Sequence, residues 1–513
     1  MLGATIRRTD MPCHHRHRQP RSVPAIALVL ALLATAAGAR QGEPPLSLRA
    51  VAKLGVDVPV ATVAGIDAAA RVAELERPAA HHGMHTKRMR VADMREVAFT
   101  PADSGRWDRT DELQVWRLRV HAPGATDLQL AFGHYDLPRG ARLYLIGADG
   151  YYQGPYTRAD ALAGGFHSPL LPGDVATIEL QVPAALADTA RDSVTLTAVG
   201  VGFRDLFARS KATGPGTSGA CNVNVVCPLG QPYPGPIRAV GHYQFTRDGG
   251  SYICSGTLLN NTAQNRKNYF LTAAHCVSSA AEAQSMVVYW NYQSTSCATL
   301  TPPAGGYFND DQHGATLRAT RDDVDFTLVE LAGAPEAAWN LYYAGWDASG
   351  AVPAGTIGIH HPMGDAKKIT AGPQPTSQPS CIDSSVTATT HWLTGPYSQG
   401  TTEGGSSGSA LFSNASSGTP RRVIGMLSGG DASCSALTPS QPNDGNDCYG
   451  KLSVAWSGGS SSASRLREWL DPGSTGAQSL DGIDQGSTPP TTGGDGHSRH
   501  AMPADIGARI PWH

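Results

Sequence analysis

A serine set between glycines is the first candidate for chemistry in this sequence. The stretch Gly404–Gly408 reads Gly-Gly-Ser-Ser-Gly. Glycines on both sides allow the backbone angles of a sharp turn and the close approach of a substrate carbonyl. The alternative is a flexible Gly/Ser loop, like the run Ser457–Ser462. Ser407 is therefore a candidate nucleophile, provided that a general base lies beside it.

A histidine at the end of an apolar run is the candidate base. The stretch Phe270–Cys276 reads Phe-Leu-Thr-Ala-Ala-His-Cys, a strand-like run followed by small residues and then His275. A general base must be held rigidly, with a pKa near the working pH, and imidazole meets the second condition. The cysteine that follows can fix the histidine through a disulfide. His275 therefore stands out among the 18 histidines.

An aspartate at the start of an apolar run is the third candidate. Asp325 opens the strand-like stretch Phe326–Leu331. A buried carboxylate needs a partner, and the Nδ1–H group of a histidine is a suitable one, because the carboxylate then fixes the tautomer of the base. Asp322 and Asp323 lie in the polar turn before the run, and we expect them to be solvated.

The chain order of these residues is His, Asp, Ser, which is the order of chymotrypsin-type enzymes rather than of subtilisins or α/β-hydrolases. We predict a catalytic triad of His275, Asp325 and Ser407, with the backbone N–H groups of Gly405 and Ser407 as the oxyanion hole. An esterase with the same triad is disfavoured by this order and by the lack of alternating strand and helix patterns.

The N-terminus carries arginines and then an apolar run, Val23–Ala36, which ends in Ala37-Gly38-Ala39. Such a run is too short to span a membrane, and it precedes small residues typical of a cleavage site. Residues 1–39 are therefore interpreted as a cleaved signal peptide, which predicts a secreted protein. The net charge is −3, with 40 basic and 43 acidic residues, which gives no reason to expect nucleic acid or membrane as a partner.

The cysteines agree with export to an oxidising compartment. The chain has nine cysteines, and without Cys13 of the signal peptide eight remain, all after residue 220. An even number in a secreted chain predicts disulfides, and eight cysteines allow 105 pairings. None has the spacing of a zinc site, so no metal or cofactor is expected. The histidines at His81–His85 fit a solvated loop better than a metal site. The eight remaining cysteines are Cys221, Cys227, Cys254, Cys276, Cys297, Cys381, Cys434 and Cys448.

The rest of the chain divides into three segments. Residues 40–215 contain no cysteine and carry alternating runs from about residue 113, which predicts a β-sandwich-like domain. The Gly-rich stretch Ala212–Gly219 is typical of an exposed, cleavable hinge. Residues 216–484 hold the candidate triad, and residues 485–513 are interpreted as a flexible C-terminal tail.

Short runs in these segments predict individual strands and one helix, Ser464–Leu470, which ends at Asp471-Pro472. The predicted strands are Leu113–Val120, Asp127–Phe132, Arg142–Ile146, Ala176–Val182, Val194–Val201, Tyr252–Leu259, Tyr269–Thr272, Met286–Tyr289, Phe326–Leu331, Thr356–Ile359 and Val423–Leu427.

From about Gly216 to Asp484 the sequence resembles the bacterial lysyl endopeptidases of the trypsin-like family. The matching stretches are Cys221–Cys227, Val288–Gln293, Ile359–Pro362, Ser407–Ser409, Asp447–Gly450 and Leu470–Gln478. The resemblance implies an all-β fold with two six-stranded β-barrels and the active site between them, here preceded by the β-sandwich-like propeptide. It also implies a secreted serine endopeptidase, made as a prepro-enzyme, that cleaves after lysine.

The resemblance implies further site residues. Asp447 would lie at the base of the S1 pocket and pair with a substrate lysine, although its sequence context alone is that of a surface turn. Leu427, Ser428 and Gly429 would pair with the substrate strand. The implied disulfides are Cys221–Cys434, Cys227–Cys297 and Cys254–Cys276, and parity then pairs Cys381 with Cys448.

Two positions depart from expectation. The lysyl enzymes carry a histidine where this chain has Ser428, which leaves a broader Lys/Arg preference as an alternative. Digestive trypsins have an aspartate before the nucleophile that receives the new N-terminus, whereas this chain has Ser406. Activation is therefore expected to remove a covering propeptide, after Lys211 or before Gly216.

A catalytically silent trypsin-fold binding protein is the remaining alternative. The expected partners are protein and peptide substrates and the chain's own inhibitory propeptide, with the protein a monomer.

Overall fold

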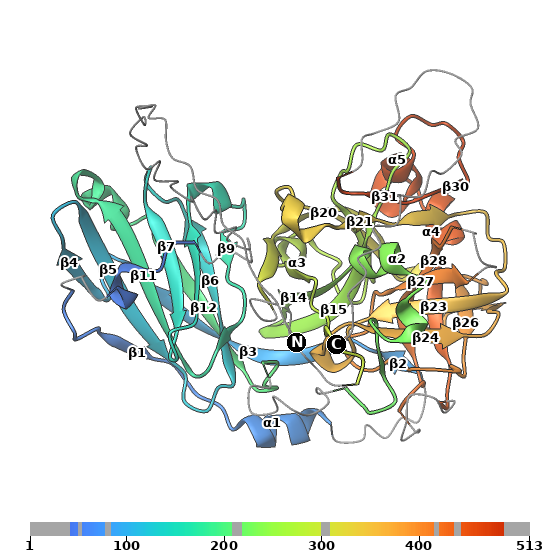
Figure 1. Ribbon diagram of the computed structural model, residues 1–513, viewed down its shortest axis with the longest axis horizontal. Helices are drawn as coiled ribbons and strands as arrows, with labels where there is room; N and C mark the ends of the chain where they lie inside the picture. Colours follow the sequence, from blue (N-terminus) through green and yellow to red (C-terminus); the bar gives the residue numbers. More distant parts are fainter. Residues whose placement is uncertain are drawn as a thin grey trace, which may run out of the picture. The chain divides into compact units, whose positions relative to one another are not determined.

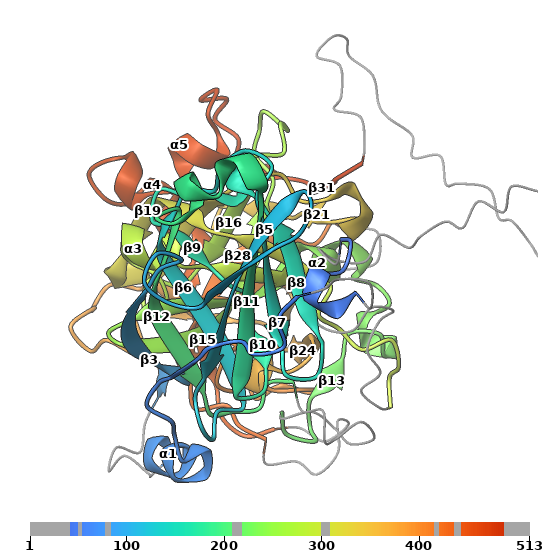
Figure 2. The same cartoon turned by 90° about the vertical axis from the view of Figure 1, so that its left-hand side faces the viewer.

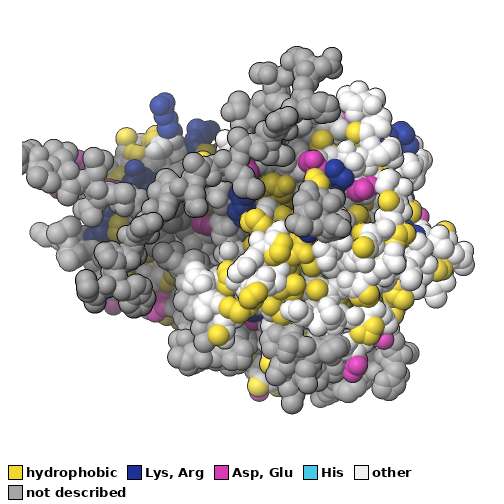
Figure 3. All heavy atoms as spheres, turned by 45° about the vertical axis from the view of Figure 1, so that its right-hand side comes forward, with side chains coloured by type: hydrophobic (Ala, Val, Ile, Leu, Met, Phe, Trp, Pro, Cys, Tyr) yellow, Lys and Arg dark blue, Asp and Glu magenta, His cyan; other side chains and the backbone are white. Residues whose placement is uncertain are grey.

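The computed structural model describes residues 42–49, 54–76, 84–207, 218–298, 308–414, 420–434 and 443–486. The predicted signal peptide, both candidate cleavage points at Lys211 and Gly216, and residues 487–513 lie outside this part of the chain. Within it, no helix is long and apolar enough to cross a membrane. On the face drawn in Figure 3, charged side chains of described residues are scattered among uncharged ones.

The N-terminal region is built from two layers of strands. One layer is a six-stranded sheet, ordered β1-β5-β11-β7-β8 with β4 beside β5. The other contains β10, β6, β12 and β3 in that order, with β9 beside β6. Alternate side chains of both layers form one core, which includes Trp116, Leu130, Leu180 and Val199. Figure 2 views this region with β5, β11, β7 and β8 towards the reader.

The bounds of these strands show that β structure begins well before residue 113. The strands are β1 (Val60–Thr62), β3 (Met89–Phe99), β4 (Arg106–Arg109), β5 (Leu113–His121), β6 (Asp127–Tyr135), β7 (Arg142–Gly147), β8 (Tyr152–Tyr156), β9 (Phe166–His167), β10 (Leu171–Pro172), β11 (Val175–Pro183) and β12 (Val194–Gly202). Five of them, β5, β6, β7, β11 and β12, correspond to the predicted runs. The alternation of β3 is hidden by charged residues, because Asp93 is paired with Arg71, Arg90 and Arg95.

The first barrel of the C-terminal region closes through one bent strand. Its strands are β14 (Val240–Arg247), β15 (Gly250–Leu259), β16 (Tyr269–Thr272), β17 (Val287–Trp290), β18 (Asp310–His313), β19 (Ala315–Arg321) and β20 (Phe326–Leu331). The hydrogen-bonded order is β18-β17-β14-β15-β16-β20-β19. Only Gly314 separates β18 from β19, and its φ of +70° allows the bend. β18 and β19 thus form the two halves of one bent strand. β18 pairs with β17 and β19 pairs with β20, at opposite ends of the sheet, so six strands form a closed barrel.

The second barrel uses a second sheet. Its strands are β13 (Val223–Asn224), β24 (Lys368–Gly372), β23 (Gly355–His360), β27 (Ala410–Asn414), β28 (Arg422–Gly430), β29 (Asp447–Lys451), β26 (His391–Thr394) and β25 (Thr376–Gln378), in this hydrogen-bonded order. β22 (Gly345–Asp347) pairs with β28 on one side and with β30 (Ser479–Leu480) on the other, and β21 (Tyr342–Tyr343) pairs with β31 (Ile483–Asp484). One core cluster joins both barrels, with Leu271 and Phe326 from the first and Ile357 and Phe412 from the second. The predicted all-β, trypsin-like fold is confirmed.

One strand of the N-terminal region continues into the barrels. β3 pairs with β12 on one side and with β15 on the other, so the N-terminal layer and the first barrel share one sheet of 12 strands. The short strand β2 (His85–Thr86), just before β3, pairs with β28 of the second barrel. Figure 1 shows β3 running from the β-sandwich to the barrels, with β2 beyond it. Residues 85–99 therefore contact both barrels.

The described helices are short: α1 (Ala68–Leu75), α2 (Pro234–Ala239), α3 (Ala280–Gln284), α4 (Leu452–Ser457) and α5 (Arg467–Leu470). The predicted helix Ser464–Leu470 is wrong in its first half. Arg465 has extended angles, φ −155° and ψ 161°, so a 3-10 turn at Ser462–Ser464 ends there and only the last four residues are α-helical.

The eight cysteines form four pairs in the barrels. Their Cα–Cα distances are 5.7 Å for Cys221–Cys434, 4.8 Å for Cys227–Cys297, 6.6 Å for Cys254–Cys276 and 6.1 Å for Cys381–Cys448. These are the pairings that the family resemblance and parity gave. The Cys254–Cys276 pair ties β15 to the residue after His275.

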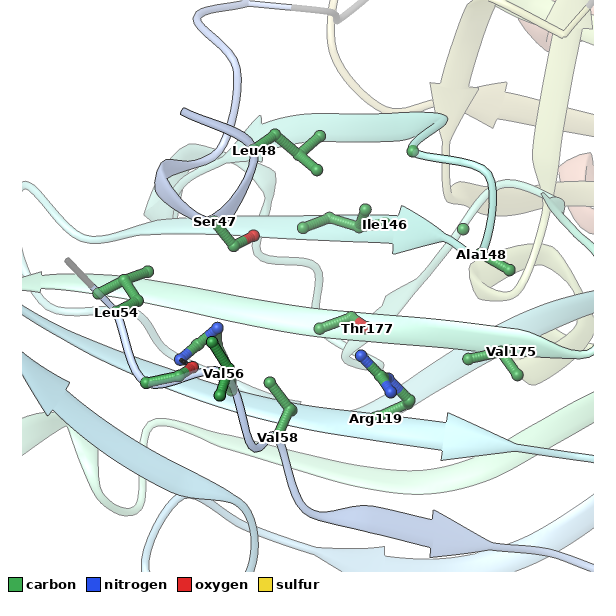
Figure 4. Close-up of a pocket in the computed structure, with 14 residues that line it drawn as sticks. Ser47, Leu48, Leu54, Val56, Val58, Arg119, Ile146, Ala148, Val175 and Thr177 are labelled. Carbon is green, nitrogen blue, oxygen red and sulfur yellow. Dashed lines mark hydrogen bonds between the residues drawn. The ribbon is translucent and has the colours of Figure 1, made fainter. Parts of the chain in front are cut away.

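A separate hollow lies on the N-terminal region. It has a volume of about 690 Å³ and is lined by Ser47, Leu48, Leu54, Val56, Val58 and neighbouring residues of β5, β7 and β11. Figure 4 shows these side chains along the sheet. It shares no residue with the candidate triad.

Candidate active site

The three residues predicted to form a triad lie in hydrogen-bonding distance of one another. Nε2 of His275 is 2.7 Å from Oγ of Ser407, and its Nδ1 is 2.8 Å from Oδ2 of Asp325. His275 follows β16 and Asp325 precedes β20, two neighbouring strands of the first barrel. Ser407 precedes β27 of the second barrel, so the bonded pair of His275 and Ser407 lies where the barrels meet. With Nδ1–H donating to the carboxylate, Nε2 is free to accept the serine proton.

Asp325 is held in an unusual backbone conformation. Its φ of +54° lies in the left-handed region, at the end of the 3-10 turn Asp322–Val324. The backbone N–H of His275 donates to Oδ1 over 2.9 Å, so both carboxylate oxygens of Asp325 are occupied by one residue. Asp322 and Asp323 are exposed, and Asp323 pairs with Arg321. The structure therefore separates Asp325 from its two neighbours as the sequence suggested.

Ser407 lies on a tight turn that only glycine can make at two positions. Gly405 and Gly408 have φ of +92° and +79°. A Cβ atom on Gly408 would collide with Oγ1 of Thr272, and one on Gly405 would lie 2.8 Å from the carbonyl oxygen of His361. The turn is closed by the N–H of Ser409, which donates to the carbonyl of Ser406 over 3.1 Å.

Ser406 is buried and bonded inside the second barrel. Its Oγ lies 2.9 Å from Nδ1 of His360 and accepts the backbone N–H of Glu403 over 3.1 Å. Burial lowers the pKa of His360 to about 3, with the charges of Lys87 and Lys368 acting in the same direction. His360 is therefore neutral at physiological pH, and Ser406 is engaged by an uncharged ring.

Asp447, the predicted base of the S1 pocket, lies inside the second barrel. This residue opens β29 and is fully buried. Its Oδ2 accepts the hydroxyl of Tyr397 over 2.8 Å and that of Thr402 over 2.6 Å. A Cβ atom on Gly430 would collide with Oδ1, so a glycine in this wall keeps access to the carboxylate open. The aspartate that resembled a surface turn in sequence is thus fully buried and hydrogen-bonded.

The pocket contains Lys87, which sequence reasoning missed. Nζ of Lys87 lies 2.8 Å from Oδ1 of Asp447, and the side chains are 4% and 0% exposed. The ammonium group also donates to the carbonyls of Ala432 and Thr402 over 2.8 and 3.1 Å and to Oγ1 of Thr402. The sequence Thr86-Lys87-Arg88 reads as a charged surface stretch, and no local signal marks its place in the pocket.

The backbone before Lys87 pairs with β28. His85 lies opposite Gly430 and Thr86 opposite Gly429, in antiparallel register. A Cβ atom on Gly429 would collide with the carbonyl oxygen of His85. Gly429 is one of the three residues expected to pair with substrate, and Gly430 was missed.

The other two expected residues contact other groups. The backbone of Leu427 bonds with Gly408 and Ser409, and so supports the nucleophile turn. Oγ of Ser428 lies 3.1 Å from Nε2 of His391. Burial lowers the pKa of His391 to about 4, although the charges of Asp325 and Asp323 oppose the shift. A neutral histidine from β26 therefore lies beside Ser428.

The carbonyl of Lys87 lies on the nucleophile turn. The backbone N–H of Gly405 donates to this oxygen over 2.5 Å. Gly405 is one of the two predicted oxyanion donors, and Ser407 is on the same turn. Among the described residues, no three His, Cys, Asp or Glu side chains are grouped so as to hold a metal ion.

The sequence is similar to known lysyl endopeptidases. A family model described as "Lysyl endopeptidase, C-terminal domain" matches residues 215–450. Lysyl endopeptidase from Pseudomonas aeruginosa is 32% identical over 350 residues, which are 66% of this chain and 73% of that protein. Among solved structures, protease Anisep from Arthrobacter nicotinovorans has a TM-score of 0.31 at 17% identity, over 45% of this chain and 93% of that one. The thermostable serine protease AL20 from an extremophilic microorganism has a TM-score of 0.29 at 14% identity, over 42% and 93%.

The barrels and the family match together define a serine endopeptidase of the trypsin-like class. Within that class, the chain belongs to the lysyl endopeptidase family.

Proposed function

We propose that this chain is a secreted endopeptidase that hydrolyses peptide bonds after lysine, through an acyl-enzyme on Ser407. One observation carries the specificity: a lysine side chain fills the pocket beside Ser407 and ends on Asp447. A desolvated ammonium needs a partner of opposite charge, and the fixed carboxylate supplies it.

In the proposed reaction, Oγ of Ser407 attacks the carbonyl carbon after the substrate lysine. His275 takes the serine proton at Nε2, and Asp325 stabilises the imidazolium through Nδ1–H. The N–H groups of Gly405 and Ser407 bind the oxygen as it becomes negatively charged. His275 then gives the proton to the leaving amine, and the same groups activate water to hydrolyse the ester.

The bonding around Asp447 favours lysine over arginine. A guanidinium is bound best when it reaches both oxygens of a carboxylate at once. Here Oδ2 already accepts two hydroxyl groups, from Tyr397 and Thr402, which leaves Oδ1 for the substrate. A compact ammonium can bond to one oxygen and to the carbonyls of Thr402 and Ala432. A broader Lys/Arg preference is the alternative, because this chain has Ser428 where the family has histidine.

The proposal includes the organisation of the precursor. Residues 1–39 would be the signal peptide, residues 40–215 an inhibitory propeptide, residues 216–484 the protease and residues 485–513 a tail. Its support is the cysteine-free β-sandwich, whose strand β3 lies on the first barrel, and the Lys87 side chain in the pocket. Four cysteine pairs suit an extracellular enzyme. We propose that the mature protein acts as a monomer on protein and peptide substrates.

The test is cleavage-site profiling of a denatured proteome by the purified mature enzyme, with the Ser407→Ala variant as the control. Cuts after lysine at a frequency far above cuts after arginine support the proposal. Equal use of both residues would establish the broader preference. Cuts without a basic residue at the P1 position, or equal cutting by the variant, would refute the assigned pocket or nucleophile.

A further inference from the structure

Residues 85–93 cross the active site as one extended segment. Before Lys87, His85 and Thr86 pair with Gly430 and Gly429 of β28. After Arg88, Met89 pairs with Ile253 of β15, and the pairing continues to Asp93 opposite Gly250. The segment thus pairs with a strand of each barrel. Extended peptides bind in this way when main-chain hydrogen bonds supply affinity and pockets read alternate side chains.

Within this segment, the bond between Lys87 and Arg88 is the one presented for reaction. The Lys87 side chain fills the pocket at Asp447, and its carbonyl oxygen accepts the N–H of Gly405 over 2.5 Å. The proposed function requires two such contacts of a P1 residue: a paired ammonium and a carbonyl bonded to a donor of the oxyanion hole, here Gly405. Arg88 is then the first residue of the leaving group.

The residues after this bond, Arg88 and Met89, are also held by contacts with the first barrel. Nη1 of Arg88 donates to the carbonyl of His275 over 2.5 Å, and its guanidinium lies 4.7 Å from the centre of the Tyr252 ring. Met89 is 6% exposed and packs in a cluster with Ile253. From there β3 enters the core sheet of the β-sandwich through β12. Cutting the bond after Lys87 breaks none of these contacts.

We propose that Lys87–Arg88 is a reactive-site bond through which the propeptide inhibits its own protease. This inference rests on the proposed function and adds the residues, the register and the chemistry of inhibition. Lys87 is the P1 residue, Arg88 the P1′ residue, and the strand β3 retains the leaving group so that cleavage is reversible.

The chemistry balances in both directions. Oγ of Ser407 bonds to the carbonyl carbon of Lys87 as the carbon–nitrogen bond to Arg88 breaks, and His275 carries the serine proton to the new amine. Because Arg88 stays in place, its amine can attack the ester and restore the peptide bond. Water can attack instead, which leaves a Lys87 carboxylate and an Arg88 ammonium in a nicked complex. No other reactant is needed.

The inhibitory part is tested with full-length wild-type, Lys87→Gln, Lys87→Arg and Arg90→Gln chains, each purified as the self-processed complex of propeptide and protease. Turnover of a small lysine amide is followed over a dilution series, which gives the apparent inhibition constant. Removing one partner of a buried ion pair weakens binding strongly, so Lys87→Gln is expected to raise this constant about 10²–10³-fold. Arg90→Gln is the matched control, because Arg90 lies on the same strand but bonds to Gly249 and Asp93. Arg90→Gln should stay within about threefold of wild type, because Asp93 keeps Arg71 and Arg95 as partners.

The reactive-bond part uses the wild-type complex, so it does not depend on folding of a variant. The complex is incubated in ¹⁸O-labelled water, and the peptide that contains Lys87 is measured by mass spectrometry after digestion at glutamate. Label in the Lys87 carbonyl, together with a nicked fraction that begins at Arg88, is the expected result. The Ser407→Ala chain should show neither.

The outcomes separate the two proposals. An inhibition constant for Lys87→Gln within threefold of wild type would overturn the role of Lys87, and absence of both label and nick would overturn the reactive bond. If no wild-type preparation cleaves the lysine amide even at the highest dilution, the proposed function fails and not the inhibitory register alone.

Discussion

The ammonium group of Lys87 lies 2.8 Å from Oδ1 of Asp447, although 360 residues separate them in sequence. Either charge would be costly to bury alone, and each removes that cost from the other. The pair therefore ties residues 85–93 to Asp447, the base of the proposed specificity pocket. It also makes Asp447 the residue whose replacement should separate substrate recognition from catalysis.

The first prediction concerns Asp447→Asn in the mature enzyme. An unpaired ammonium in the pocket should cost roughly 3–5 kcal/mol, about 10²–10⁴ in kcat/KM for basic substrates. The triad does not change, so labelling by a small, non-basic organophosphonate should survive. Matched Lys, Arg and Leu amides are the measurement. An equal fall for all three would make Asp447 a structural residue, through its bonds to Tyr397 and Thr402.

The second prediction concerns Ser407→Ala. Loss of the nucleophile should lower turnover by about 10⁶-fold and leave the fold intact, since one hydroxyl is removed. The precursor should then remain full length when kept free of active enzyme. Ser409→Ala is the matched control on the same turn, and it should keep activity within a few-fold. More than a hundredth of wild-type activity in Ser407→Ala would rule out Ser407 as the nucleophile.

The third prediction concerns Asp325→Asn. The side chain would still reach His275, but an amide stabilises the wrong imidazole tautomer, so kcat should fall about 10⁴-fold. Asp323→Asn is the control, because this exposed residue pairs only with Arg321 among the described ion pairs. The measurement is steady-state kinetics on a lysine amide at neutral pH. Equal losses in both variants would show that the change acts through the turn rather than through the histidine.

Strands that depend on short-range sequence patterns could be predicted from the sequence. The strands Tyr269–Thr272 and Phe326–Leu331 match β16 and β20 at both ends, because continuous apolar runs bounded by polar turns leave few alternatives. These two strands fix the positions of His275 and Asp325. The helix Ser464–Leu470 was wrong in its first half, where Arg465 adopts extended angles.

The contents of the pocket depend on contacts between distant parts of the chain. Asp447 reads as a turn residue, and only the family resemblance marked it. Lys87 and the strand β3 carry charged neighbours that hide their burial, so no periodicity reveals them. Their burial follows from pairing with β15 and β28, which lie more than 150 residues further along the chain.

The last prediction concerns the pH dependence of the propeptide. Burial raises the pKa of the Asp127 carboxyl in β6 to about 7, and the charge of Asp205 acts in the same direction, while a hydrogen bond from Thr126 opposes it. The unfolded chain would titrate near its ordinary value. Between about pH 4 and pH 7 the folded state therefore holds a proton that the unfolded state has released. Stability contributed by the protonated group is complete below about pH 4 and is lost as the pH rises through 7.

The size of this effect is about 4 kcal/mol, from a shift of about three pH units. Asp127→Asn should flatten the fall in stability between about pH 4 and pH 7, because an amide does not ionise. The urea midpoint, read by hydrogen exchange in β6 and β12 of the full Ser407→Ala chain, is the measurement. Asp188→Asn is the control, since that side chain is fully exposed. An unchanged slope in Asp127→Asn would show that another group governs the stability of the β-sandwich. A flattened slope would show that ionisation of Asp127 destabilises the β-sandwich as the pH rises from about 4 to about 7.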